Sequence, residues 1–161
     1  MLRDATEGDL PGIVLVTGGS RGIGAATARL AAQRGYSVCV NYRRDRDAAE
    51  KVVRAVEEIG AKAVAVCADV AVEADVVRLF EACDAALGRV TGLVSNAVRP
   101  GFIYTAMHAS GGEPNRVDRV KEFVPMKRGG SPDEVASAIL WLLSDEASFT
   151  TGSFIDVTGG K

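Results

Sequence analysis

The chain has 161 residues, of which 47% are hydrophobic and 25% charged, so it can bury a core and its length fits a single domain. The formal net charge of −2 and the pI near 5.5 offer no basic surface for nucleic acid. The N-terminal residues are polar and lack the apolar stretch of a signal peptide. No later stretch approaches the ~18 apolar residues of a membrane span, so we expect a cytoplasmic protein.

Short apolar runs alternate with helical segments from residue 13 onward. The runs are continuously apolar, which is typical of strands buried on both faces of a parallel sheet. The predicted strands are residues 13–17, 37–41, 63–68, 92–98 and 154–157, and the predicted helices before the fourth strand are residues 23–34, 47–59 and 72–87. The pattern predicts an α/β, Rossmann-like doubly wound parallel sheet, shortened to about five strands.

The third predicted helix is recognised by an apolar face, and the fourth by the residues that cap its N-terminus. The third helix places six apolar side chains on one face, which we expect to be buried: Val72, Val76, Leu79, Phe80, Cys83 and Leu87. The fourth opens with "SPDE", in which Ser131 caps, Pro132 takes the first position and Glu134 completes a capping box. Residues 99–130 are predicted to be irregular. We expect a tail at residues 1–11 and one domain at residues 12–161.

The three cysteines, Cys39, Cys67 and Cys83, are far apart and lie in apolar runs. This arrangement favours reduced, buried thiols over disulfides or a metal site.

The turn "TGGSRGIG" joins the first predicted strand to the first predicted helix. Its glycines let the backbone approach a pyrophosphate, and the helix N-terminus beyond them attracts anions; a tight turn without a ligand would use glycines too. The T-G-x3-G-x-G spacing resembles that of the short-chain dehydrogenase/reductase family. The resemblance implies dinucleotide contacts from Thr17, Gly18, Ser20, Arg21, Gly22, Ile23 and Gly24.

Further motifs follow in the order that this family shows. Asp69 and Val70 are similar to its adenine-contacting position, Asn96 and Ala97 to part of its N-N-A-G signature, and "FIDVTGG" to its final strand. The sequence "RPGFIYT" resembles its P-G-x3-T loop, which implies nicotinamide contacts from Pro100, Gly101, Ile103 and Thr105. The resemblance covers about residues 13–160 and is closest to ketoacyl reductases and sugar dehydrogenases.

The end of the second predicted strand indicates which dinucleotide is preferred. Here an acidic residue would bind a ribose 2′-OH, and a basic one a 2′-phosphate. The sequence "NYRRD" has Asn41 in place of the acid, followed by Tyr42, Arg43 and Arg44, of which one arginine is expected to be a solvated surface residue. With Arg21, these guanidinium groups favour NADP(H) over NAD(H).

The catalytic segment of the family is absent. The N-N-A-G strand and the R-P-G strand share Asn96-Ala97, and the intervening Ser strand and Y-x3-K helix are missing. The chain is roughly 90 residues shorter than the ~250 that such a domain can reach. If the Pro-Gly loop continues the fourth strand, it is displaced by roughly 10 Å, or two strand spacings.

No tyrosine has a lysine four residues later, so we expect no turnover. Two alternatives stay open: an active reductase using a partner chain or Tyr104 with Lys121 or Lys127, and an assembly module with a vestigial nucleotide site. His108 is expected at the loop surface. Losing two helices would bare one sheet face. Either residues 102–124 fold across that face or two chains pack these faces together, and we expect a homodimer or higher oligomer through a surface that the family does not use. We expect no metal, nucleic acid or membrane partner.

Overall fold

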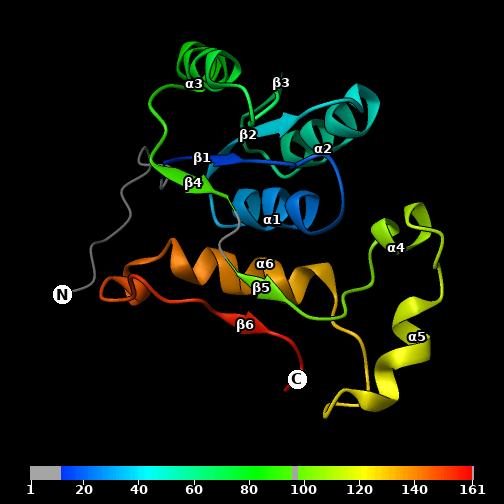
Figure 1. Ribbon diagram of the computed structural model, residues 1–161. Coiled ribbons are helices and arrows are strands. Elements are labelled where there is room, and N and C mark those ends of the chain that lie inside the picture. The colour runs from blue at the N-terminus through cyan, green and yellow to red at the C-terminus, as the bar shows by residue number, and fades with distance from the viewer. Residues whose placement is uncertain (1–11, 96–97, 161) are drawn as a thin grey trace.

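A computed structural model describes residues 12–95 and 98–160, and Figure 1 shows its ribbon. Four parallel strands form one sheet in the order β3-β2-β1-β4. They are β1 (Ile13–Val16), β2 (Ser37–Tyr42), β3 (Ala63–Cys67) and β4 (Gly92–Val94). The predicted α/β Rossmann-like fold with a parallel sheet is therefore confirmed.

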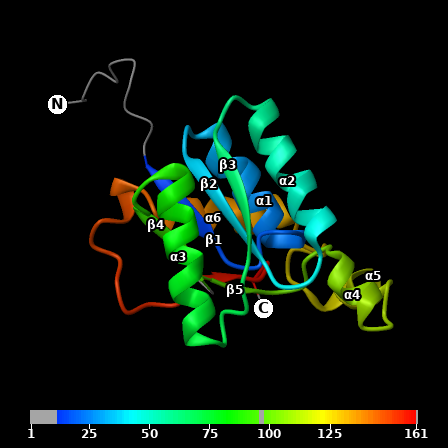
Figure 2. The ribbon, with the colours of Figure 1, turned by 90° about the horizontal axis from the view of Figure 1, so that it is seen from above.

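Helices cover the two faces of this sheet unequally (Figures 1 and 2). On one face, α1 (Gly22–Gln33), α2 (Arg46–Glu58) and α6 (Pro132–Leu142) pack with the strands into the larger core. On the other, α3 (Glu73–Leu87) packs over a smaller core around Leu15 and Leu79. Within the described part of the chain, no helix is long and apolar enough to cross a membrane.

The predicted strand at residues 92–98 is wrong in its extent, because the chain leaves the sheet after Val94. It then forms β5 (Arg99–Pro100), which pairs in parallel with β6 (Asp156–Val157) in a separate two-stranded sheet. The backbone amide of Arg99 donates to the Ile155 carbonyl at 2.9 Å, and its guanidinium pairs with Asp156 at 2.8 Å. Within residues 12–95 and 98–160 the strands therefore form one sheet of four and one of two, and the predicted strand 154–157 shortens to residues 156–157.

The segment predicted to be irregular contains short helices. They are α4 (Ala106–Ser110), α5 (Arg116–Val120) and the 3-10 turn η1 (Lys121–Phe123); a second such turn, η2 (Asp145–Ala147), follows α6. Glu113 accepts from Arg116 at 3.0 Å and from Arg119 at 2.8 Å, which ties the segment to itself. Both views show α4 and α5 away from α3, so they do not cover its sheet face.

The α3 face is only partly covered. Leu79 and Cys83 are buried as predicted, whereas Val72 is 46% exposed because it precedes the helix as its N-cap. Leu93 of the edge strand β4 is 48% exposed. Cys39 is also buried, but the prediction of burial is wrong for Cys67, which ends the edge strand β3 and is exposed.

Candidate functional site

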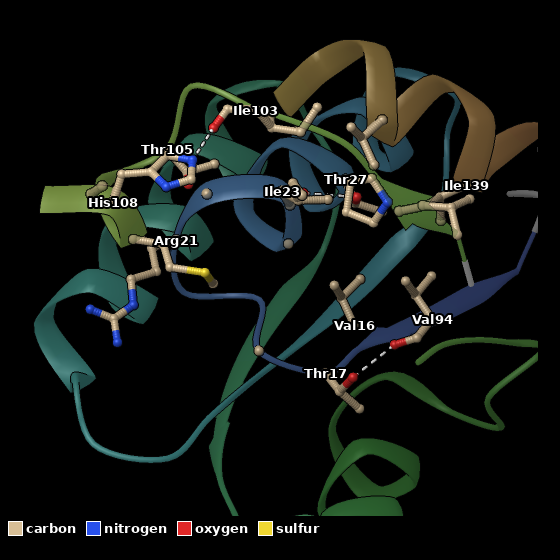
Figure 3. Close-up of a pocket in the computed structure, with 18 of the residues that line it drawn as sticks. Val16, Thr17, Arg21, Ile23, Thr27, Val94, Ile103, Thr105, His108 and Ile139 are labelled. Atoms are coloured by element: carbon tan, nitrogen blue, oxygen red, sulfur yellow. Dashed lines mark hydrogen bonds between the residues drawn. The ribbon is translucent and has the colours of Figure 1, made fainter. Parts of the chain in front are cut away.

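A cavity of about 550 Å³ opens where β1 and β4 end, against α1 and α6 (Figure 3). Ten residues predicted to contact the dinucleotide line it: Thr17, Gly18, Arg21, Gly22, Ile23, Gly24, Pro100, Gly101, Ile103 and Thr105. Figure 3 shows Arg21, Thr105 and His108 at one end and Val16, Val94 and Ile139 at the other. The cavity thus has the charged Arg21 at one end and a mixture of aliphatic and threonine side chains at the other.

The Gly-rich turn is shaped to admit a phosphate. Gly18 has φ +61°, and a Cβ placed on it would meet no atom within 4 Å, so its backbone borders open space. A Cβ on Gly24 would lie 2.4 Å from the Gly18 carbonyl oxygen, so only glycine allows this close approach. No side chain among the described residues caps α1, which leaves the amides of its first turn available to an anion.

Asn41 supports the Gly-rich turn through hydrogen bonds on the side away from the cavity. It is 3% exposed; its side-chain oxygen accepts from the Gly18 amide at 3.3 Å, and its carbonyl accepts from the Gly19 amide at 2.8 Å. Its Nδ2 donates to the Ala68 carbonyl at 3.1 Å. Asn41 lines neither of the two cavities that the described residues form here, and its side chain links the turn to the ends of β2 and β3.

The Pro-Gly loop reaches the same cavity as the Gly-rich turn. The Gly101 amide donates to the Val157 carbonyl at 2.9 Å, and Ile103 bridges to Gly130. The predicted displacement of roughly 10 Å rested on a continuous fourth strand. That continuity is wrong, because β5 belongs to the second sheet, and Gly101 and Thr105 line the same cavity as Gly18 and Gly22.

The remaining predicted contacts lie outside this cavity. Tyr42 is buried, and Arg43 pairs with Asp69 at 2.9 Å, whereas Arg44 makes no ion pair within the described residues. None of these four, nor Val70, lines either of the two cavities. Asn96 and Ala97 lie outside the described residues.

A second, more open groove of about 560 Å³ adjoins the first and shares Arg21, Gly22, Thr105 and Ala106 with it. Ser20, a predicted contact, lies here, and so do Arg29 of α1 and Lys51 of α2. Sequence reasoning missed both cations. Nothing in a local motif marks them, because they meet only when α1 and α2 pack side by side.

His108 is also placed differently from its prediction as a loop surface residue. It is half-buried in α4, lines the cavity, and has its Nε2 3.0 Å from the Ile103 carbonyl oxygen. The available signal was its position three residues after Thr105. The cavity wall also includes Thr27, Met107, Val135 and Ile139, which sequence reasoning did not single out.

The Tyr104 side chain contacts residues outside the dinucleotide cavity. Its hydroxyl donates to Asp118 at 2.9 Å, and Lys121 pairs with the same carboxylate at 3.2 Å. The hydrogen bond to Asp118 raises the pKa of Tyr104, with a smaller contribution from desolvation. Tyr104 borders the second groove and not the cavity that the two glycine motifs line.

No group of three or more potential metal-binding side chains occurs among residues 12–95 and 98–160.

Comparison with known proteins agrees with this geometry. The family model described as short chain dehydrogenase matches residues 12–116, and that described as enoyl-(acyl carrier protein) reductase matches residues 95–161. Among solved structures, a doubly substituted mutant of a short-chain dehydrogenase/reductase from Serratia marcescens has a TM-score of 0.82 at 21% identity, covering 92% of this chain and 96% of that one. A hydroxysteroid dehydrogenase from Escherichia coli also has a TM-score of 0.82, at 22% identity, covering 92% and 95%.

Two relatives are similar in sequence over nearly their whole length. An uncharacterized oxidoreductase, YgfF, from Escherichia coli (strain K12) is 36% identical over 245 residues, spanning 92% of this chain and 99% of the relative. The 3beta-hydroxysteroid dehydrogenase 1 of Eggerthella lenta is 27% identical over 246 residues, spanning 94% of each. Both alignments are longer than this chain, so both relatives contain residues with no counterpart here. On these matches, the chain belongs to the short-chain dehydrogenase/reductase family.

Proposed function

We propose that this protein binds a nicotinamide dinucleotide, with NADP(H) preferred, and does not turn over carbonyl or alcohol substrates. The observation that carries the binding is that the Gly-rich turn and the Pro-Gly loop line one cavity. The open space at Gly18 and the uncapped first turn of α1 fit a pyrophosphate, while Ile23 and Ile103 supply apolar surface for a ring. A bound dinucleotide would supply the hydride for oxidoreductase chemistry.

The lack of turnover follows from the groups that the chain does not have. Reduction of a carbonyl needs a group that gives a proton to the oxygen, which a tyrosine with a depressed pKa supplies in this family. No Y-x3-K sequence is present. Tyr104 has a raised pKa, its hydroxyl donates to Asp118, and it lies outside the dinucleotide cavity. These facts weigh against the alternative of a reductase that uses Tyr104.

An internal deletion accounts for the missing groups. The two family models match overlapping ranges, the second of which begins at residue 95, and alignment with the longer relatives requires more positions than this chain has. We infer one domain over residues 12–161 in which the catalytic segment has been lost next to β4. The protein is then a truncated pseudoenzyme.

The preference for NADP(H) rests on arginines near the turn. Arg21 lines both cavities, and Arg44 makes no ion pair within the described residues, so either can bind a 2′-phosphate. Isothermal titration calorimetry with NADPH and NADH tests the proposal. We expect weak binding, tighter for NADPH, and no NADPH oxidation with simple ketones. Absence of heat for both dinucleotides at millimolar concentration would instead support the assembly module with a vestigial site.

The incomplete cover of the α3 face supports self-association. Leu93 on β4 and Val77 on α3 are 48% and 52% exposed, and α4 and α5 lie elsewhere. We infer a homodimer, or a higher oligomer, that buries this face. Light scattering on Leu93→Asp, with Lys62→Asp as an exposed control, should show the first variant as a monomer and the second as an oligomer. A compact monomer of the unmodified protein would refute this assembly.

A further inference from the structure

The second groove is built from facing stripes of two helices. Gly22, Ala25 and Arg29 follow one another at helical spacing on α1, and Ala48, Lys51 and Val52 do so on α2. Pro132 and Asp133 at the start of α6 also line the groove. Figure 1 shows these three helices beginning on the same side of the molecule, near α4.

Three of the side chains that line the groove are cationic: Arg21, Arg29 and Lys51. None of them makes an ion pair or a side-chain hydrogen bond within the described residues, whereas the neighbouring Arg46 pairs with Glu50 at 3.6 Å. Asp133 is the one acidic residue among the described residues of the groove wall. The groove therefore gathers an excess of positive charge in a protein whose formal net charge is −2.

Side chains supply most of this positive charge. The N-termini of α2 and α6 contribute little, because capping side chains already accept from their free backbone amides. Asp45 caps α2 by accepting from the Ala48 amide at 3.0 Å, and Ser131 with Glu134 caps α6. The open first turn of α1 lies where the groove meets the dinucleotide cavity. In Figure 3, the Arg21 guanidinium points away from Val16 and Val94.

One wall of the groove is a fixed aromatic ring. Tyr104 is 45% exposed, its hydroxyl is held by Asp118, and a Cβ on Gly129 would lie 2.7 Å from a carbon of the ring. Asp118 and the backbone at Gly129 therefore hold the ring in position. A flat group bound in the groove could stack on it while an attached anion meets the three cations.

We propose that this groove binds the phosphate group of a nucleotide through Arg21, Arg29 and Lys51. Arginine and lysine donate charge-assisted hydrogen bonds to phosphate oxygens, and these are stronger than bonds between neutral groups. The phosphate has two possible sources. It is either the 2′-phosphate of the dinucleotide in the adjoining cavity, in which case the inference rests on the proposed function, or the phosphate of a separate nucleotide.

Inorganic pyrophosphate is the first probe, titrated by calorimetry without any dinucleotide. The double variant Arg29→Ala/Lys51→Ala should weaken its binding by about tenfold or more. The matched control, Arg34→Ala/Lys62→Ala, removes the same charge from exposed residues that line neither cavity, and should change the affinity less than about twofold. All four substituted side chains are exposed, so both variants should keep the fold.

NADP⁺ and NAD⁺ then separate the two sources. If the groove variant loses affinity for NADP⁺ and keeps it for NAD⁺, the cofactor supplies the phosphate. If pyrophosphate still binds in the presence of saturating NADP⁺, a second nucleotide supplies it. The inference is overturned if the groove variant and the control bind pyrophosphate and NADP⁺ equally. If neither dinucleotide binds but pyrophosphate binding is still weakened in the groove variant, the proposed function is refuted while the inference about the groove stands.

Discussion

The hydroxyl of Tyr104 donates a hydrogen bond to the carboxylate of Asp118 at 2.9 Å, and this pair directs the tyrosine away from the dinucleotide cavity. Lys121 binds the same carboxylate, and the net effect of this cluster is to raise, not lower, the pKa of the phenol. A tyrosine and a lysine near the Pro-Gly loop therefore exist in this chain, but they form a structural cluster.

The first prediction concerns Tyr104→Phe. The substitution should leave the background rate of NADPH oxidation unchanged and should reduce the free energy of unfolding only slightly, since the hydrogen bond that it removes joins two exposed groups. NADPH absorbance assays and urea titrations measure the two effects. Steady turnover in the unmodified protein that this substitution abolishes would show that Tyr104 is catalytic.

The second prediction concerns Asn41, which is buried and bonded to Gly18 and Ala68. Asn41→Ala leaves these backbone groups without partners and should cost about 2 kcal/mol of stability. It should also weaken dinucleotide binding, because the Gly-rich turn loses its support. Asn41→Asp keeps the acceptor for the Gly18 amide but loses the donor to the Ala68 carbonyl, so it separates the contributions of the two bonds. Equal dinucleotide affinity in all three proteins would show that Asn41 does not shape the turn.

The third prediction separates the two arginines after β2. Arg43 is paired with Asp69, while Arg44 makes no ion pair within the described residues. Arg44→Ala should therefore reduce the preference for NADPH over NADH more than Arg43→Ala does, and the double substitution should reduce it at least as much. Calorimetric affinities for the two dinucleotides decide this. A larger effect from Arg43 alone would mean that its pairing with Asp69 is broken on binding.

The fourth prediction concerns pH and the start of α6. The Arg128 guanidinium, together with the Ser131 amide, lowers the pKa of Glu134 to about 2. A carboxyl group whose pKa is lower in the folded state stabilises that state above its unfolded pKa of 4.5, and this stabilisation is lost as the pH falls toward 2. Glu134→Gln should thus destabilise the protein at pH 7 and differ little from the original near pH 2.

Ser131→Ala is the companion substitution, because it removes the other half of the capping box, in which the Ser131 hydroxyl accepts from the Glu134 amide at 3.2 Å. It should cost about 1 kcal/mol at pH 7, and most of this loss should remain near pH 2, because the hydroxyl accepts from a backbone amide that does not titrate. Thermal unfolding followed by circular dichroism measures both variants. A Glu134→Gln effect that does not shrink at low pH would contradict the assignment of the shift to its charge.

The fifth prediction concerns thiol reactivity. Burial raises the pKa of Cys39 and Cys83, while Cys67 is exposed, and the thiolate is the reactive form. An aromatic disulfide reagent should therefore modify one thiol rapidly in the folded protein and all three in denaturant. Cys67→Ser should abolish the rapid phase. A rapid phase that persists in this variant would show that Cys39 or Cys83 is accessible.

The sequence by itself determined the local elements and the family. Continuous apolar runs indicated the parallel strands, Ser131 and Glu134 marked the start of α6 through a capping box that the structure contains, and the Gly-rich turn identified a dinucleotide-binding fold. Each of these signals lies within a few neighbouring residues, because helix capping, turn formation and strand burial depend on local backbone geometry.

The tertiary structure alone decided which distant segments meet. Residues 92–98 look like one strand, yet Arg99 and Pro100 pair with β6, and this pairing brings the Pro-Gly loop to the cavity of the Gly-rich turn. The partner of Tyr104 and the grouping of Arg29 with Lys51 depend in the same way on how α1, α2 and the segment before α6 pack. No local pattern encodes such contacts, because strand pairing and helix packing are set by the free energy of the whole folded chain.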